Sequence, residues 1–250
     1  MRVCELKIYA LILCAAIPLA GCARAQEPPK TAPVQQEPMK PVPPTPIDKK
    51  KAELGEPTWD PEWNRIVEQA LPASMVSREV PRDVRRFCPN FYGMSEKDKR
   101  VFWAYFFQAL AGAEAGLNPQ ATVRHTDLTP ADSPTGVVPG RTQGLLQLSY
   151  KDEKRYGCDF DPTADKGLKL NDPARTILNP KNNLTCGIKI LEKQIIEQRK
   201  PLLSSTSYWS TLQPGTAGYR MLAKQMTNPP ATCHVPAKKA RASIPMKTAE

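Results

Sequence analysis

Long apolar stretches and histidine are scarce in this chain of 250 residues. Its single apolar run, residues 8–20, is interrupted by Pro18 and is shorter than the about 20 residues that span a bilayer, which excludes a polytopic membrane protein. The Gly-X-Y repeat of collagen is absent as well. The two histidines, His125 and His234, lie far apart and the cysteine spacings match no zinc site, so we predict neither a metal nor a cofactor.

The first 21 residues predict an export signal. Arg2 and Lys7 flank its charged start, and the small residues of Leu19-Ala20-Gly21-Cys22 follow the apolar run. This tetrapeptide resembles the lipobox of bacterial lipoproteins, in which the preceding peptide is removed and the cysteine is acylated. Because alanine follows the cysteine, the resemblance implies a periplasmic protein anchored to the outer membrane through Cys22. An ordinary signal cleaved after Ala25 is the alternative.

Proline, in contrast, is abundant, with 27 residues in the chain. Eight of them fall within residues 28–46, and the residues between them are mostly charged or polar. Such a segment cannot bury apolar surface, so we predict that residues 22–57 form an extended, disordered linker that holds a domain away from its anchor. A proline-rich ligand for a partner protein is the other interpretation. Residues 236–250 are basic and aperiodic, which predicts a disordered tail.

The net charge of +10 becomes +9 once residues 1–21 are removed, since 33 basic and 24 acidic residues remain. This excess favours an anionic partner such as a membrane surface or an acidic polymer. Nucleic acid is not expected, because the chain carries an export signal and its basic residues are scattered.

Residues 58–235 show helical periodicity and no convincing strand pattern, which predicts a single, mainly α-helical domain. Asp60-Pro61 and Asn179-Pro180 each have the N-cap and first-turn proline of a helix start. Two shorter helices are predicted at residues 204–212 and 216–226.

The longest predicted helix begins after Ser95 and runs to about Ala115. Five aromatic residues within positions 102–107 make it apolar on most sides, so we expect it to be central and buried. Glu114 is the one carboxylate in its last turn. Burial and the negative end of the helix dipole both raise the pKa of a carboxyl at this position, which suits a general acid near neutral pH. A glutamate that caps or pairs at a surface helix end is the alternative.

Four short motifs follow in order from this helix end. They are Glu114-Ala115-Gly116-Leu117-Asn118-Pro119, then Gly144-Leu145-Leu146-Gln147, then Asn179-Pro180 with Asn182, Asn183 and Gly187, then Tyr208-Trp209. This order resembles the catalytic domain of the soluble lytic transglycosylases (SLT), which are related to goose-type lysozymes. The resemblance covers residues 102–219 and implies a mainly α, lysozyme-like fold.

The family resemblance implies a peptidoglycan-cleaving enzyme that acts on the β-1,4 bond between N-acetylmuramic acid and N-acetylglucosamine. Glu114 matches its catalytic acid and base. The residues expected to contact the glycan strand are Gly144, Leu146, Gln147 and Tyr208. Asn182 or Asn183 and Gly187 match a structural helix that packs under the cleft. We expect a monomer whose partners are glycan strands and, through the lipid, a membrane.

Two chemistries remain open within this expectation. A lytic transglycosylase needs no second carboxylate, because the C6 hydroxyl of the substrate attacks and Glu114 returns as the base. A hydrolytic lysozyme of the inverting type needs a second carboxylate to activate water, and Asp127 or Asp132 are the candidates. We favour transglycosylation.

Three departures from the family pattern keep a third alternative open. Ala115 replaces the serine after the glutamate, Trp209 replaces the asparagine after the tyrosine, and residues 122–142 form a longer link than usual. The third alternative is therefore a catalytically silent peptidoglycan-binding lipoprotein.

Four cysteines remain after the signal and Cys22 are set aside, which in an exported chain predicts two disulfides with three possible pairings. The alignment with the family suggests the pairs Cys158–Cys186 and Cys88–Cys233, the second of which would clasp the two ends of the domain.

Overall fold

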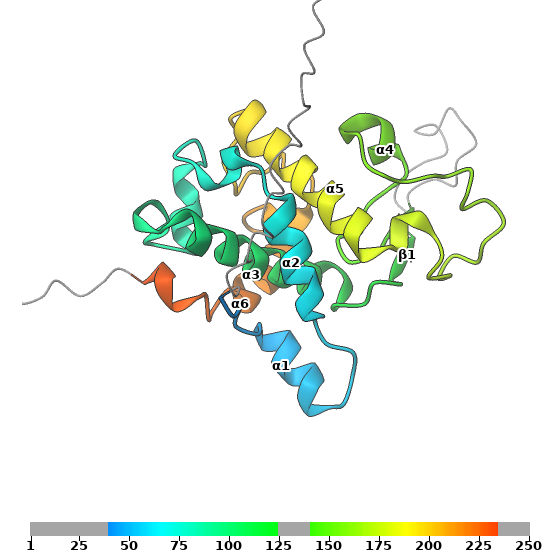
Figure 1. Ribbon diagram of the computed structural model, residues 1–250, viewed down its shortest axis with the longest axis horizontal. Helices are drawn as coiled ribbons and strands as arrows, with labels where there is room; N and C mark the ends of the chain where they lie inside the picture. Colours follow the sequence, from blue (N-terminus) through cyan, green and yellow to red (C-terminus); the bar gives the residue numbers. More distant parts are fainter. Residues whose placement is uncertain (1–39, 125–140, 235–250) are drawn as a thin grey trace, which may run out of the picture. The chain divides into compact units, whose positions relative to one another are not determined.

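The computed structural model describes residues 40–124 and 141–234 (Figure 1), which form a mainly helical, lysozyme-like domain as predicted. The export signal, Cys22, the basic tail, Asp127 and Asp132 lie outside these residues. Within the described part, no helix is long and apolar enough to cross a bilayer. The α-helices are α1 (Pro46–Glu53), α2 (Pro61–Ala70), α3 (Glu96–Ala115), α4 (Lys151–Tyr156), α5 (Pro180–Glu192) and α6 (Ala217–Gln225).

Single turns of helix and one short hairpin connect these helices. The hairpin strands are β1 (Thr122–Arg124) and β2 (Arg141–Gln143). The turns are η1 (Ala73–Val76), η2 (Arg82–Arg86), η3 (Phe91–Gly93), η5 (Thr176–Leu178), η6 (Lys193–Glu197), η7 (Ser210–Leu212) and η8 (Ala231–Cys233).

Helix α3 is the core of the domain. Its start is capped by Ser95, whose Oγ accepts a hydrogen bond from the Asp98 amide, and Gly116 ends it in the left-handed conformation with φ of 57°. Helices α2 and α6 pack along α3, and α5 packs against α2 (Figure 1). The five aromatic side chains of its middle are fully buried: Phe102, Trp103, Tyr105, Phe106 and Phe107.

The predicted start of each flanking helix is confirmed by its cap. The Asp60 carboxylate accepts a hydrogen bond from the Glu62 amide at the start of α2. The Asn179 side chain accepts from the Lys181 and Asn182 amides at the start of α5. These caps satisfy amides that have no partner within the helix.

The predicted helix at residues 204–212 is wrong except for its last turn, η7. The segment instead forms a loop whose two ends are joined by a hydrogen bond from the Ser204 amide to the Leu212 carbonyl. The backbone amide of Tyr208 donates a hydrogen bond to the side chain of Gln194, which lies outside this segment. The resulting loop places Tyr208 and Trp209 side by side, with ring centroids 4.8 Å apart.

The linker boundary predicted at residue 57 is also wrong, because α1 packs on the domain. Asp48 of α1 accepts hydrogen bonds from the Trp59 amide (2.8 Å) and from the Gln108 side chain of α3 (2.9 Å). The Ile47 amide donates to the Gln225 side chain of α6. These attachments are polar and come from distant residues, so the proline-rich composition of the segment does not predict them.

An extended stretch leads from residue 40 into α1 and follows α3. Lys40 forms an ion pair with Asp98 in the first turn of α3. Ile47 lies against Gly112 in the last turns of α3, so close that a Cβ on this glycine would be 2.7 Å from the Ile47 Cγ2 atom. The stretch therefore spans most of the helix.

The structure also corrects the expectation that the domain contains no strands. Strands β1 and β2 pair antiparallel, with Thr122 opposite Gln143 and Arg124 opposite Arg141. Each strand has three residues, which is too short for an alternating pattern to emerge in the sequence.

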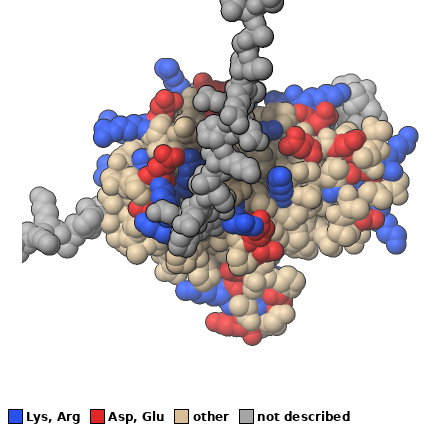
Figure 2. Space-filling model, viewed as in Figure 1, with Lys and Arg blue, Asp and Glu red and all other residues tan. Residues whose placement is uncertain are grey.

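Both predicted disulfides are present, Cys88–Cys233 and Cys158–Cys186. The first links residues 145 positions apart and is supported by a hydrogen bond from the Asn90 amide to the Cys233 carbonyl. The second joins the end of α4 to α5. On the face drawn in Figure 2, basic and acidic side chains of the described residues are interspersed, so both signs of charge are spread over this face.

Candidate active site

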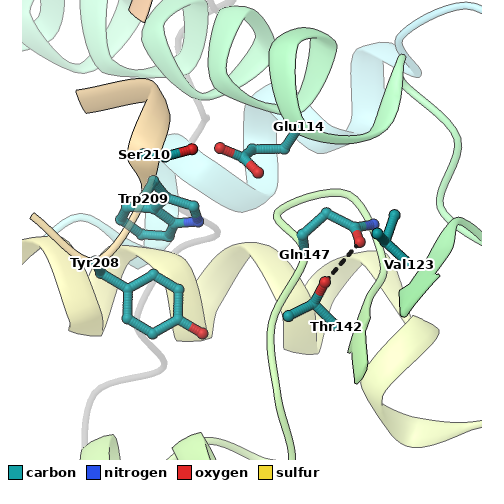
Figure 3. Close-up of a pocket in the computed structure, with 7 residues that line it drawn as sticks. All are labelled: Glu114, Val123, Thr142, Gln147, Tyr208, Trp209 and Ser210. Carbon is teal, nitrogen blue, oxygen red and sulfur yellow. Dashed lines mark hydrogen bonds between the residues drawn. The ribbon is translucent and has the colours of Figure 1, made fainter. Parts of the chain in front are cut away.

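A cavity of about 390 Å³ opens at the C-terminal end of α3. Glu114 projects into it from α3, and Figure 3 shows Tyr208 and Trp209 on one side of the cavity and Gln147, Thr142 and Val123 on the other. The lining residues are Glu114, Val123, Thr142, Gln147, Tyr208, Trp209 and Ser210.

Glu114 is the one acidic residue among the described residues that line this cavity. Its side chain is half-buried, and the Thr211 hydroxyl donates a hydrogen bond of 2.6 Å to its Oε1 atom. Burial raises the pKa of the Glu114 carboxyl, while the hydrogen bond from Thr211 acts against this rise. A carboxyl that keeps its proton closer to neutral pH can act as a general acid.

Gln147 forms the wall opposite Tyr208 and sits in a strained turn. Its own φ is 50° and that of Gly144 is 78°, both in the left-handed region. The Gln147 amide group donates to the Gly144 carbonyl (2.8 Å), and its Oε1 accepts from the Thr142 hydroxyl (2.9 Å; dashed in Figure 3). These bonds fix the side chain of Gln147 at the cavity edge.

Gly144 and Leu146, predicted to contact the glycan, are themselves residues of this turn. Leu146 is fully buried, and neither residue lines the cavity. A Cβ on Gly144 would lie 2.3 Å from the Asn183 side-chain nitrogen, so only glycine fits there. A sequence motif alone does not distinguish a residue that lines a cavity from one that packs behind the lining, and the predicted glycan contacts of Gly144 and Leu146 stay predictions.

Asn183 of α5, rather than Asn182, holds the turn. It is completely buried, and its Oδ1 accepts from the Leu146 amide (2.9 Å). Its Nδ2 donates to the carbonyls of Gln143 (3.2 Å) and Ile177 (2.9 Å). Both the oxygen and the nitrogen of the Asn183 side chain thus form hydrogen bonds with backbone groups.

Gly187, one helical turn further along α5, allows Leu146 to pack closely against the helix. A Cβ on this glycine would lie 2.2 Å from the Leu146 Cδ1 atom. The close packing predicted for Gly187 is confirmed.

Tyr208 and Trp209 form the other wall. The Tyr208 hydroxyl donates to Oδ2 of Asp152 at 2.6 Å, and burial, together with the charge of Asp152, raises the pKa of this hydroxyl. The Trp209 indole nitrogen donates to the Leu146 carbonyl at 2.8 Å, and the ring is almost wholly buried. Trp209 therefore connects the two walls, whereas the sequence indicated only a departure from the family pattern at this position.

Sequence reasoning missed Thr211 and Asp152, which contact the site residues. Thr211 is 97 positions from Glu114, and Asp152 is 56 positions from Tyr208. No local motif marks either residue, so only the fold reveals them. Asp127 and Asp132, the candidate second carboxylates, lie outside the described residues. Among the residues that the structure describes, no group of three or more histidine, cysteine or acidic side chains could hold a metal ion.

No family model and no curated protein matches the sequence. The fold is similar to solved structures of DslA (Bd0314) from Bdellovibrio, a protein with a lysozyme-like fold. The wild-type form of DslA is 23% identical, with a TM-score of 0.53 over 69% of this chain and 91% of that chain. Two DslA variants, each with one glutamate replaced by glutamine, are 22% identical over the same shares, with TM-scores of 0.53 and 0.52. The similarity establishes the lysozyme-like fold.

Proposed function

We propose that this protein cleaves peptidoglycan glycan strands by lytic transglycosylation, with Glu114 as general acid and then general base. The observation that carries the proposal is the position of Glu114, a half-buried carboxyl with a raised pKa in the cavity of a lysozyme-like fold. The bond cleaved is the β-1,4 bond between N-acetylmuramic acid and N-acetylglucosamine, as the motif order around Glu114, Gln147 and Tyr208 implies.

Each proton in the proposed reaction passes through Glu114. The protonated carboxyl donates to the glycosidic oxygen, the bond from this oxygen to the muramic acid C1 breaks, and positive charge develops at the sugar ring. The C6 hydroxyl of the same sugar then bonds to C1 and gives its proton to the Glu114 carboxylate. The products are a free N-acetylglucosamine end and a 1,6-anhydromuramoyl end, and Glu114 returns to its starting form.

The cavity supports transglycosylation over hydrolysis because its described lining offers one carboxylate. Hydrolysis with inversion uses two carboxyl groups about 6.5–9.5 Å apart with a water between them. The nearby Asp152 does not line the cavity, and its Oδ2 atom accepts hydrogen bonds from Tyr208 and the Ser149 amide.

We further propose that the protein acts as a monomer in the periplasm, held at the outer membrane by a lipid on Cys22.

The test is to incubate purified sacculi with the protein and to identify the released muropeptides by mass spectrometry. We expect anhydromuramoyl products with the unchanged chain and none with Glu114→Gln. The matched control is Glu96→Gln, which replaces an exposed glutamate at the other end of α3. It should release the same products as the unchanged chain.

Two other outcomes would replace the proposal. Reducing muramic acid ends would indicate hydrolysis and direct attention to Asp127 and Asp132. Binding to sacculi without release, equal in the unchanged chain and Glu114→Gln, would indicate a glycan-binding protein. Acylation of Cys22 is tested separately by the mass of the N-terminal peptide.

A further inference from the structure

Four of the polar side chains that line the cavity donate hydrogen bonds to other protein atoms. The Gln147 amide group donates to the Gly144 carbonyl, and the Thr142 hydroxyl donates to Gln147. The Trp209 indole donates to the Leu146 carbonyl. The Tyr208 hydroxyl donates to Asp152. Four donors on both walls are therefore engaged before any ligand arrives.

Asp152 is the least expected of these acceptors. It lies on α4 and is 2% exposed, yet it belongs to none of the motifs in the sequence. Its Oδ2 atom accepts both the Tyr208 hydroxyl (2.6 Å) and the Ser149 amide (2.8 Å). Both short bonds converge on one oxygen, so the carboxylate has a single favourable orientation.

The helix that carries Asp152 is itself fixed to α5. Cys158, directly after α4, forms the disulfide with Cys186 of α5. The Lys189 side chain of α5 also donates to the Gly157 carbonyl at the end of α4. Asp152 is therefore a rigid acceptor at the hydroxyl end of the Tyr208 side chain.

The hydroxyl group of a tyrosine has one hydrogen to donate, and its oxygen can also accept hydrogen bonds. Because the hydrogen of Tyr208 goes to Asp152, its oxygen offers only lone pairs to the cavity. Donation to a carboxylate also polarises the O–H bond and makes the oxygen a stronger acceptor. Figure 3 shows the hydroxyl of Tyr208 extending toward the side of the cavity where Thr142 lies.

We propose that Asp152 is a positioning residue that fixes the Tyr208 hydroxyl as a hydrogen-bond acceptor for a sugar hydroxyl of the glycan bound beside Glu114. The inference rests on the proposed function and specifies how its cavity recognises the substrate. Asp152 acts through Tyr208, because it does not itself line the cavity.

The experiment measures binding in the Glu114→Gln background, so that no cleavage interferes. The probe is a soluble tetrasaccharide of alternating N-acetylglucosamine and N-acetylmuramic acid, titrated by calorimetry. We expect Tyr208→Phe to weaken binding about 5- to 10-fold, the size of one hydrogen bond. Asp152→Ala should weaken it equally, because the hydroxyl of Tyr208 is then no longer oriented.

The double variant Tyr208→Phe/Asp152→Ala tests whether the two residues act as a unit. It should bind no more weakly than either single variant, because Asp152 has nothing left to orient. Asp152→Asn should bind within about twofold of the parent, since an amide oxygen can accept both bonds that now converge on Oδ2. Glu153→Gln, the neighbouring position on α4, is the matched control and should bind like the parent.

Additive losses in the double variant would overturn the inference, as would equal losses in Asp152→Asn and Asp152→Ala. Failure of the parent to bind the tetrasaccharide would overturn it too. Failure of the proposed function looks different: the binding results would hold, but sacculi would release no products with the intact Glu114. Thermal unfolding of each variant separates loss of binding from loss of fold.

Discussion

The Thr211 hydroxyl donates a hydrogen bond of 2.6 Å to the Glu114 carboxyl, across 97 positions of sequence. This bond favours the ionised carboxylate, whereas burial favours the protonated acid. The pKa of Glu114 is therefore set by two opposing effects, burial and the Thr211 hydrogen bond, and a substitution can change the second without the first.

Replacing Thr211 with valine should shift the pH profile of cleavage. Thr211→Val removes the hydrogen bond but keeps the side-chain volume, so the pKa of Glu114 rises further. A general acid must be protonated, so the alkaline limb of kcat/KM should move to higher pH. The measurement is muropeptide release across a pH series. Thr206→Val, an exposed position in the same loop, should leave the profile unchanged; an unmoved limb in Thr211→Val would refute the prediction.

Glu114→Gln should make the protein more stable at neutral pH. Because the pKa of Glu114 is raised above its ordinary value of 4.5 in the folded state, that state holds the proton more tightly than the unfolded chain. Stability therefore falls as pH rises from 4.5 through the folded pKa, where an unfavourable buried charge forms. A neutral glutamine has no such charge and can still accept from Thr211.

Thermal unfolding at several pH values checks this sign. The Tm of Glu114→Gln should exceed that of the unchanged chain at pH 7, and the two should converge below pH 4.5, where both side chains are neutral. A variant that is less stable at pH 7 would show that the carboxylate stabilises the fold.

Gly187→Ala should lower the free energy of unfolding by about 1–3 kcal/mol, although alanine is the better helix former by about 1 kcal/mol. The reason is the new Cβ, which would lie 2.2 Å from the Leu146 Cδ1 atom. Urea unfolding measures the loss. The double variant Gly187→Ala/Leu146→Ala removes the clash, so it should lose less stability than the sum of the two single variants. Strict additivity would contradict the packing.

The two disulfides should contribute unequally to stability. In the chain-entropy relation, a loop of 145 residues stabilises by about 5 kcal/mol and one of 28 residues by about 4 kcal/mol. We expect Cys88→Ser/Cys233→Ser to unfold at lower urea concentration than Cys158→Ser/Cys186→Ser. Cleavage should respond in the opposite order, because loss of the Cys158–Cys186 bridge releases α4 and with it Asp152. Equal effects on both measurements would contradict this division.

The parts of the structure that the sequence predicts are those with local causes. Ser95, Asp60 and Asn179 each cap a helix within three residues of themselves, and such caps leave a readable motif. The central position of α3 follows from its aromatic residues, and the placement of Glu114 in the cavity follows from the helix end and the family motifs.

The parts that the sequence does not predict have distant causes. Helix α1 packs on the domain through Asp48, whose partners Trp59 and Gln108 lie 11 and 60 positions away. Asp152 and Thr211 reach the site in the same way. A polar contact between distant segments leaves no periodic pattern in either of them, so the proline content predicted disorder for residues 46–53, which form α1.

The stretch between Lys40 and Ile47 determines how mechanical force would enter the domain. It runs alongside α3, from Asp98 in the first turn to Gly112 in the last turns, a distance of about 21 Å along the helix. A pull on the chain at residue 40 therefore loads the Lys40–Asp98 pair first. Glu114 lies at the opposite end of the same helix, about 24 Å from Asp98. Peeling this stretch from α3 would proceed from Asp98 toward Gly112, so the contact nearest Glu114 is the last one of the stretch to be loaded.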